Sequence, residues 1–236
     1  MVVLLCAIAL KQHYSTASVN DLRWILLPTT LLVELVTGER FVFEAFAGYM
    51  NRDHSFIIAA SCSGVNFMIT AFLMLTLGKL WRERSRSVSW ASIPIAAFTA
   101  YITTIVANTV RIAAALLVRE IDAELIWLNP EQLHRFEGIV IYFGFLIFLF
   151  VMTEKLKKED DRHHGPEKSL ARLCLFPLLV YYATTIGVPL INGAWATGHF
   201  WEYAAFVFVV PLLLLGFLAV SRFIGNHWLP PDQRRL

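Results

Sequence analysis

Three side chains whose types suit acyl transfer stand far apart in the sequence. Cys62 lies in the segment SCSGVNF, Arg111 ends the segment NTVR, and His134 lies in LHRFEG. A deprotonated thiol is a nucleophile, and an imidazole can accept a proton and later return it. A guanidinium stays charged in apolar surroundings and can stabilise a thiolate or an oxyanion. Together they indicate a cysteine acyl-transfer site, provided that the fold brings them together.

Neighbouring residues support each of the three. The residues that follow Cys62 are small or polar and leave space for a substrate and for water: Ser63, Gly64 and Asn66. Asn108 precedes Arg111 by three residues, so the two share a helical face. Glu137 follows His134 at the same spacing, and we expect its carboxylate to hold the imidazole in one tautomer.

Simpler interpretations exist for each residue type. A cysteine in a membrane is usually a small hydrophobic residue, which is how we interpret Cys6 and Cys174. An arginine near a helix end can extend to the interface, and a histidine there is commonly interfacial. Three histidines fall on the same predicted side of the membrane: His54, His134 and His199. The residues alone therefore leave open which imidazole serves the thiol.

The composition requires membrane helices to position these residues. The chain of 236 residues is 57% hydrophobic and 16% charged, against about 25% charged in ordinary soluble domains. A soluble globule, a disordered chain and a disulfide scaffold are excluded, and a net charge of +2 does not suggest nucleic-acid binding. A span needs roughly 17–25 apolar residues. After a short run at 2–10, apolar runs occupy 22–37, 56–80, 90–118, 136–152, 170–191 and 200–220.

These runs predict an all-α fold, a polytopic membrane bundle of about six to seven transmembrane helices in one domain spanning 1–236. If four basic segments lie on one side, that side holds 15 of the 20 lysines and arginines and is therefore cytoplasmic: 11–23, 79–86, 155–172 and the tail after 221. This topology makes 153–169 a cytoplasmic loop and 221–236 a cytoplasmic tail. It places Cys62, Arg111 and His134 in or near the outer leaflet.

In order, sidedness and helix placement, these residues resemble the exosortase/archaeosortase family of membrane proteases. The hallmark of that family is a cysteine in C-[SA]-G, an arginine in N-x-x-R and a downstream histidine. This chain reads Cys62-Ser63-Gly64, then Asn108-Thr109-Val110-Arg111, then His134. The resemblance covers about 22–152, which we interpret as the catalytic core, followed by two C-terminal spans within 170–220. It is greatest for the exosortase K subgroup.

The resemblance implies a membrane-bound thiol protease and transpeptidase of the bacterial inner membrane, with its active site facing the periplasm. Its substrates would be secreted proteins with a C-terminal sorting signal of the PEP-CTERM type: a short motif, a transmembrane helix and a basic end. Cys62 would be the nucleophile, Arg111 the thiolate or oxyanion stabiliser, and His134 the general acid and base, with Asn108 in support. The lipid bilayer is the other implied partner. No metal, organic cofactor or nucleic acid is implied.

Two other classes of function remain open. A multi-span transporter or channel would also use an intramembrane site of Arg111 and Asn108, although the ionisable groups gather on one side instead of lining a central path. A structural or assembly protein would use the same residues only for packing. Glu34 is the other charge predicted to lie deep, where it would be a structural partner of Arg111. The segment 39–53 mixes aromatic and charged residues, and it predicts either an interfacial segment at the site entrance or an ordinary loop.

Overall fold

The computed structural model describes residues 2–82, 91–120, 130–160 and 170–228. The chain divides into two compact units, Met1–Tyr181 and Tyr182–Leu236. Parts of the predicted cytoplasmic loop and tail, residues 161–169 and 229–236, lie outside the described residues.

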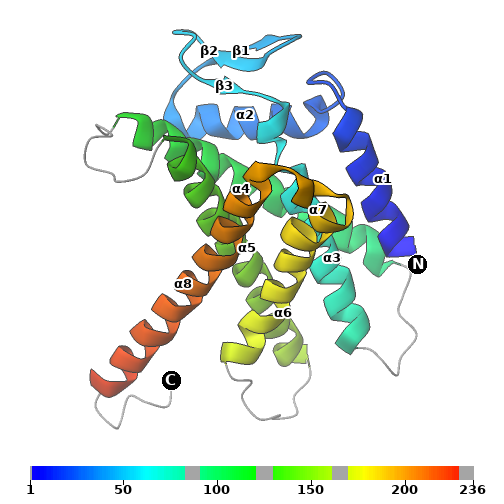
Figure 1. Ribbon diagram of the computed structural model, residues 1–236, viewed down its shortest axis with the longest axis vertical. Coiled ribbons are helices and arrows are strands. Elements are labelled where there is room, and N and C mark those ends of the chain that lie inside the picture. Colours follow the sequence, from blue (N-terminus) through cyan, green and yellow to red (C-terminus); the bar gives the residue numbers. More distant parts are fainter. Residues whose placement is uncertain (1, 83–90, 121–129, 161–169, 229–236) are drawn as a thin grey trace. The chain divides into compact units, whose positions relative to one another are not determined.

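The first unit begins with two short helices and a small sheet, and continues with long helices (Figure 1). In chain order its elements are α1 (Val2–Thr16), α2 (Arg23–Thr37), β1 (Phe41–Glu44), β2 (Gly48–Asn51), β3 (Ile57–Ile58), the 3-10 turn η1 (Ala60–Ser63), α3 (Val65–Arg82), α4 (Ser92–Glu120), α5 (Pro130–Asp160) and α6 (Leu170–Tyr182). Helix α4 packs against α2, α3 and α5, so it forms the centre of the unit.

The second unit continues from the last residue of α6. It contains the π-helical segment η3 (Ala183–Gly187), α7 (Val188–Ile191), the 3-10 turn η4 (Ala194–Ala196) and α8 (Gly198–Trp228). The Tyr182 hydroxyl donates to the Phe208 carbonyl at 2.7 Å, and the two rings stack at 5.3 Å. These contacts fix the start of the unit against α8.

Five helical segments of the described residues are long and apolar enough to cross a membrane: Ala60–Trp81, Ser92–Val118, Gln132–Leu156, Cys174–Ile191 and Phe200–Ser221. A mostly helical chain with membrane-spanning segments was expected from the apolar runs. The predicted count of six to seven spans goes beyond these five. Helices α1 and α2 have 15 residues each, or about 22 Å, which is shorter than the hydrocarbon core of about 30 Å.

Helix α2 lies along the sheet. Near its start, the Arg23 guanidinium sits over the Phe43 ring at 4.6 Å, and near its end the Glu34 carboxylate accepts from the Phe41 N–H at 2.7 Å. Both ends of α2 thus contact β1, and in Figure 1 the helix runs across the view beneath the sheet while α3 descends from it. Residues 22–37 therefore form a helix, as expected, but one that is too short for the crossing predicted there.

The expectation of a purely helical fold is wrong between residues 41 and 58. This segment forms a three-stranded antiparallel sheet in the order β1-β2-β3, in which Phe43 pairs with Tyr49 and Tyr49 with Ile58. Aromatic residues favour this local structure. Gly48 has φ +124°, and a Cβ there would meet the Ile58 carbonyl oxygen, so a glycine is needed at the start of β2, where the strand lies beside β3. The sheet replaces the ordinary loop considered for 39–53.

Glu34 also differs from its predicted role. It forms an ion pair with Arg40 at 3.7 Å in addition to its bond with the Phe41 N–H. Its described partners are therefore Arg40 and the first residue of β1, in place of the predicted partner Arg111.

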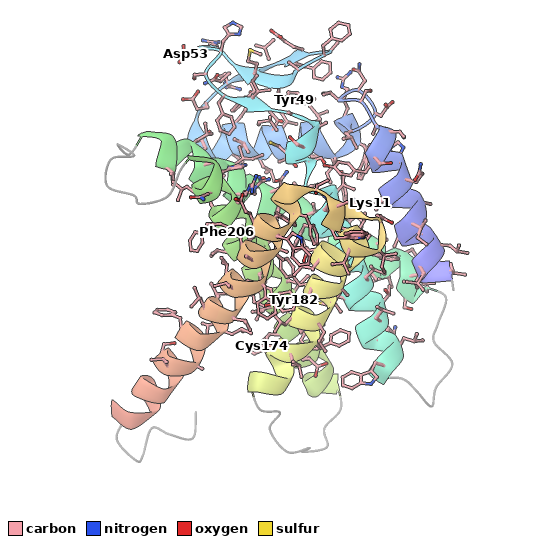
Figure 2. All side chains as sticks on the ribbon, in the orientation of Figure 1. Lys11, Tyr49, Asp53, Cys174, Tyr182 and Phe206 are labelled. Carbon is pink, nitrogen blue, oxygen red and sulfur yellow. The ribbon has the colours of Figure 1, made fainter. Side chains whose placement is uncertain are left out.

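The basic residues near the N-terminus lie at the opposite end of the unit from Lys79. The Lys11 ammonium donates to Asn66 Oδ1 at 2.7 Å, and partial burial lowers the pKa of Lys11 below its usual value. Asn66 is the second residue of α3, whereas Lys79 is 13 residues later, about 20 Å along the helix axis. Lys11 and Lys79 therefore lie at opposite ends of α3, although the charge pattern predicts that their segments share one side of the membrane. Figure 2 labels Lys11 on α1.

Candidate active site

Cys62 lies in a tight turn at the start of the first predicted span. It belongs to η1 and precedes α3, whereas the span register had placed it six residues inside a helix. Its N–H donates to the Ala59 carbonyl at 2.9 Å. Gly64 then adopts φ +72°, a left-handed conformation that ends the turn and directs the chain into α3. The thiol is therefore presented from a helix end.

This turn packs closely against two other helices. A Cβ at Gly64 would lie 3.1 Å from Thr104 Cγ2 and 3.4 Å from both Asn108 Cγ and Tyr142 Oη. The adjacent Ser63 is fully buried, and its hydroxyl has no hydrogen-bond partner within the described parts of the chain. The absence of a side chain at position 64 thus lets the cysteine turn reach polar groups of α4 and α5.

Asn108 fixes the cysteine turn to α4. This fully buried amide donates from Nδ2 to the Cys62 carbonyl at 2.5 Å and accepts at Oδ1 from the Tyr142 hydroxyl at 2.9 Å. A buried amide is costly to leave unpaired, and here both of its ends are used. Asn108 therefore holds the backbone of Cys62 against α4.

Arg111 extends across to α5. Its Nη1 donates to the Tyr142 hydroxyl oxygen at 3.2 Å, and its Nη2 lies 2.6 Å from His134 Nε2. A guanidinium only donates hydrogen bonds, so Nε2 accepts and the neutral imidazole carries its proton on Nδ1. A Cβ at Gly138 would lie 3.1 Å from Arg111 Nε, so a glycine on α5 leaves room for the side chain. The arginine thus has protein groups as its described hydrogen-bond partners.

The three predicted catalytic residues are linked through these contacts. The hydrogen-bond chain runs from His134 through Arg111, Tyr142 and Asn108 to the carbonyl of Cys62, and it joins η1, α4 and α5. The Cys62 thiol is near enough to the guanidinium to interact with it electrostatically. In the residues that the structure describes, no hydrogen bond joins the thiol to the imidazole of His134.

Two predicted supporting residues have other partners. Glu137 Oε1 is buried without a hydrogen-bond partner among the described residues, and the carboxyl group interacts electrostatically with Arg111. The described residues show no hydrogen bond from Glu137 to His134, which is held by Arg111 instead. Asn66 is exposed and accepts from Lys11. Glu137 and Asn66 therefore do not make the supporting contacts that the sequence predicted for them.

The structure also separates the three candidate histidines. His54 lies in the turn between β2 and β3, and His199 belongs to the second unit. The imidazole that contacts Arg111 is that of His134. His134 is thus the histidine linked to the cysteine turn by the hydrogen-bond chain.

Tyr142 is the site residue that sequence reasoning missed. It lies in the apolar run GIVIYFGF of α5, where a tyrosine suggests packing more than chemistry. The available signal was its spacing, because His134, Gly138 and Tyr142 follow one another at intervals of four and so share a helical face. All three contact or adjoin Arg111.

Comparisons with protein-family models, with curated proteins and with solved structures gave no match to this chain.

Proposed function

We propose that this protein is an exosortase-like membrane cysteine peptidase or transpeptidase that cleaves C-terminal sorting signals of secreted proteins. The observation that carries the proposal is the hydrogen-bonded link between the cysteine turn, a buried arginine and an imidazole from three separate elements. These are the groups that acyl transfer by a thiol requires. Their polar surroundings inside an apolar bundle favour a functional role.

Arg111 is suited to stabilising negative charge at the reacting centre. It is hydrogen-bonded to two neutral groups, Tyr142 and His134, so its charge is not consumed by a bidentate carboxylate. A fixed donor of this kind is most effective where water is excluded.

The resting contact between Arg111 and His134 suggests how the reaction begins. His134 Nε2 is occupied by an N–H of Arg111, so it cannot at the same time accept the thiol proton. A substrate carbonyl that binds Arg111 would compete for this N–H and free Nε2. The thiol proton then passes to His134 as sulfur attacks the carbonyl carbon, and the imidazolium returns the proton to the leaving amine as the peptide bond breaks.

The first reaction leaves a thioester on Cys62. Water or an amine then attacks the thioester carbonyl, His134 accepts the proton of that nucleophile, and the thiol is restored as its leaving sulfur is protonated. Attack by water gives hydrolysis, and attack by an amine gives transfer of the substrate to an acceptor.

The membrane arrangement supports a site on the outer face. Cys62 is at the start of α3, Arg111 is in the second half of α4 and His134 is in the first turns of α5, so the antiparallel helices bring them to one end. Lys79 lies at the other end of α3, which the basic segments 79–86 and 155–172 predict to be cytoplasmic. A substrate helix with its basic end in the cytoplasm would present its scissile bond at the level of Cys62.

The test is co-expression with a secreted reporter that ends in a Pro-Glu-Pro motif, an apolar helix and a basic tail. We expect Cys62→Ala to abolish the size shift of the reporter on an immunoblot, while Cys6→Ala and Cys174→Ala process it normally. Membrane abundance is measured in parallel, because a purely structural protein would respond through abundance. Normal processing by an abundant Cys62→Ala protein would remove the peptidase proposal and favour a transporter.

A further inference from the structure

The Tyr142 hydroxyl connects the Arg111 guanidinium to the Asn108 amide, which holds the Cys62 turn. It accepts from Arg111 Nη1 at 3.2 Å and donates to Asn108 Oδ1 at 2.9 Å. The ring stacks on Phe67 of α3 with centroids 4.9 Å apart and an interplanar angle of 16°. The hydroxyl is therefore held in place by groups from α3 and α4, while its own backbone belongs to α5.

The direction of each hydrogen bond in this chain is fixed from both ends. Arg111 only donates, and the Cys62 carbonyl only accepts. Tyr142 must therefore accept from Arg111 and give its single proton to Asn108 Oδ1, which leaves the amide nitrogen of Asn108 facing the Cys62 carbonyl. A phenylalanine at this position would remove both bonds, so that the Cys62 carbonyl alone would orient the Asn108 amide.

We propose that Tyr142 is a positioning residue that holds the Cys62 turn and the Arg111 guanidinium in one fixed geometry. It acts through Asn108 on the backbone of the nucleophile and directly on the arginine. The effect on substrate processing rests on the proposed function, whereas the reactivity of Cys62 is measured without a substrate.

The test uses the full-length protein in membranes, with Cys6 and Cys174 replaced by alanine so that iodoacetamide reports on Cys62. Tyr142→Phe keeps the ring that stacks on Phe67 and removes one oxygen. Tyr101→Phe is the matched control, because its hydroxyl donates to the Trp24 carbonyl away from this chain of bonds. We expect Tyr142→Phe to slow alkylation at a fixed pH by about tenfold, as for loss of a buried hydrogen-bond partner, and Tyr101→Phe to leave it within twofold.

A double-mutant cycle distinguishes positioning from general loosening of the fold. If Tyr142 acts through Asn108, adding Tyr142→Phe to Asn108→Ala should slow alkylation by much less than tenfold. If the losses of the two single variants multiply in the double variant, the route through Asn108 is overturned. Alkylation of Tyr142→Phe at the rate of Tyr101→Phe would overturn the whole inference. Membrane abundance and thermal unfolding of each variant are measured alongside.

Reporter processing gives the second arm. We expect Tyr142→Phe to slow processing about tenfold by lowering kcat, with little change in KM, because the tyrosine positions Arg111 and does not itself bind the peptide. If Cys62→Ala processes normally, the proposed function fails and the alkylation arm still tests Tyr142. If Cys62→Ala abolishes processing while Tyr142→Phe matches Tyr101→Phe in both arms, the positioning role alone fails.

Discussion

Arg40 and Arg111, both in the first unit, differ in the exposure of their side chains and in their partners. The Arg40 side chain is 71% exposed and pairs with the Glu34 carboxylate at 3.7 Å. The Arg111 side chain is much less exposed, and its hydrogen bonds go to the neutral groups of Tyr142 and His134. Water and a carboxylate in an ion pair balance the charge of Arg40. Arg111 interacts electrostatically with the Glu137 carboxyl group, but its described hydrogen bonds go to neutral partners. We therefore call Arg40 a framework arginine, because it pairs with Glu34 of α2 beside the sheet, and Arg111 a site arginine.

The largest effect expected from this comparison concerns the imidazole that Arg111 holds. His134→Ala should lower the rate of reporter processing by about 10²- to 10⁴-fold, because it removes the proposed general base and acid. Processing is followed by pulse-chase labelling of the reporter. His54→Ala is the matched control, since His54 lies in the turn of the sheet, and it should process normally. Greater sensitivity at His54 than at His134 would show that the base has been assigned to the wrong residue.

Arg111→Lys should lower the processing rate by about 10²-fold, as for loss of an oxyanion donor. An ammonium keeps the positive charge but lacks the planar fork that reaches Tyr142 and His134 together. The same pulse-chase assay measures this variant, with its membrane abundance as the control. Processing at the normal rate would mean that only a positive charge is required and that the two hydrogen bonds have no role.

A substitution at Gly64, which ends the cysteine turn, should have a smaller effect. Gly64→Ala forces an alanine into a left-handed conformation at φ +72° and within 3.1 Å of Thr104, so the free energy of unfolding should fall by about 1–2 kcal/mol and processing several-fold. Gly144→Ala is the control, because Gly144 is helical and its Cβ would meet no heavy atom within 4 Å. Thermal unfolding in detergent measures both variants. Equal stability of the two would contradict the tight packing of the cysteine turn.

The smallest effect is expected at the exposed arginine. Arg40→Ala should change the free energy of unfolding by less than about 1 kcal/mol and processing by less than twofold, because an exposed ion pair contributes little. The same unfolding and processing assays apply. A loss as large as that of Arg111→Lys would end the distinction between a framework arginine and a site arginine.

The long apolar helices could be predicted because the hydrocarbon core demands about 20 apolar residues for each crossing. Runs 90–118 and 200–220 correspond to α4 and α8 within a few residues at their starts. The sheet between residues 41 and 58 could not be predicted, because its strands are two to four residues long. Their pairing depends on distant contacts such as that of Arg23 with Phe43. Charge counting grouped Lys11 with Lys79 because it assumed that 22–37 crosses the membrane, whereas α2 has only 15 residues and lies along the sheet.

The candidate catalytic residues could be predicted from residue type and spacing, whereas their partners could not. Asn108 shares a face with Arg111 at a spacing of three, and this local rule does not depend on the rest of the fold. The sequence suggested Glu137 as the partner of His134 by the same rule, but Arg111 from another helix occupies Nε2. Tyr142 was missed because its importance lies in contacts to α3 and α4, which only the three-dimensional arrangement reveals.

The thiol of Cys62 can be tested directly by graded alkylation of a protein that carries Cys6→Ala and Cys174→Ala. Mass spectrometry gives the fraction of Cys62 that is modified, and cleavage of the tailed reporter is measured on the same samples. The account predicts that the cleavage rate falls in proportion to the modified fraction and reaches zero at full modification. Cleavage at an undiminished rate by protein fully alkylated at Cys62 would contradict it.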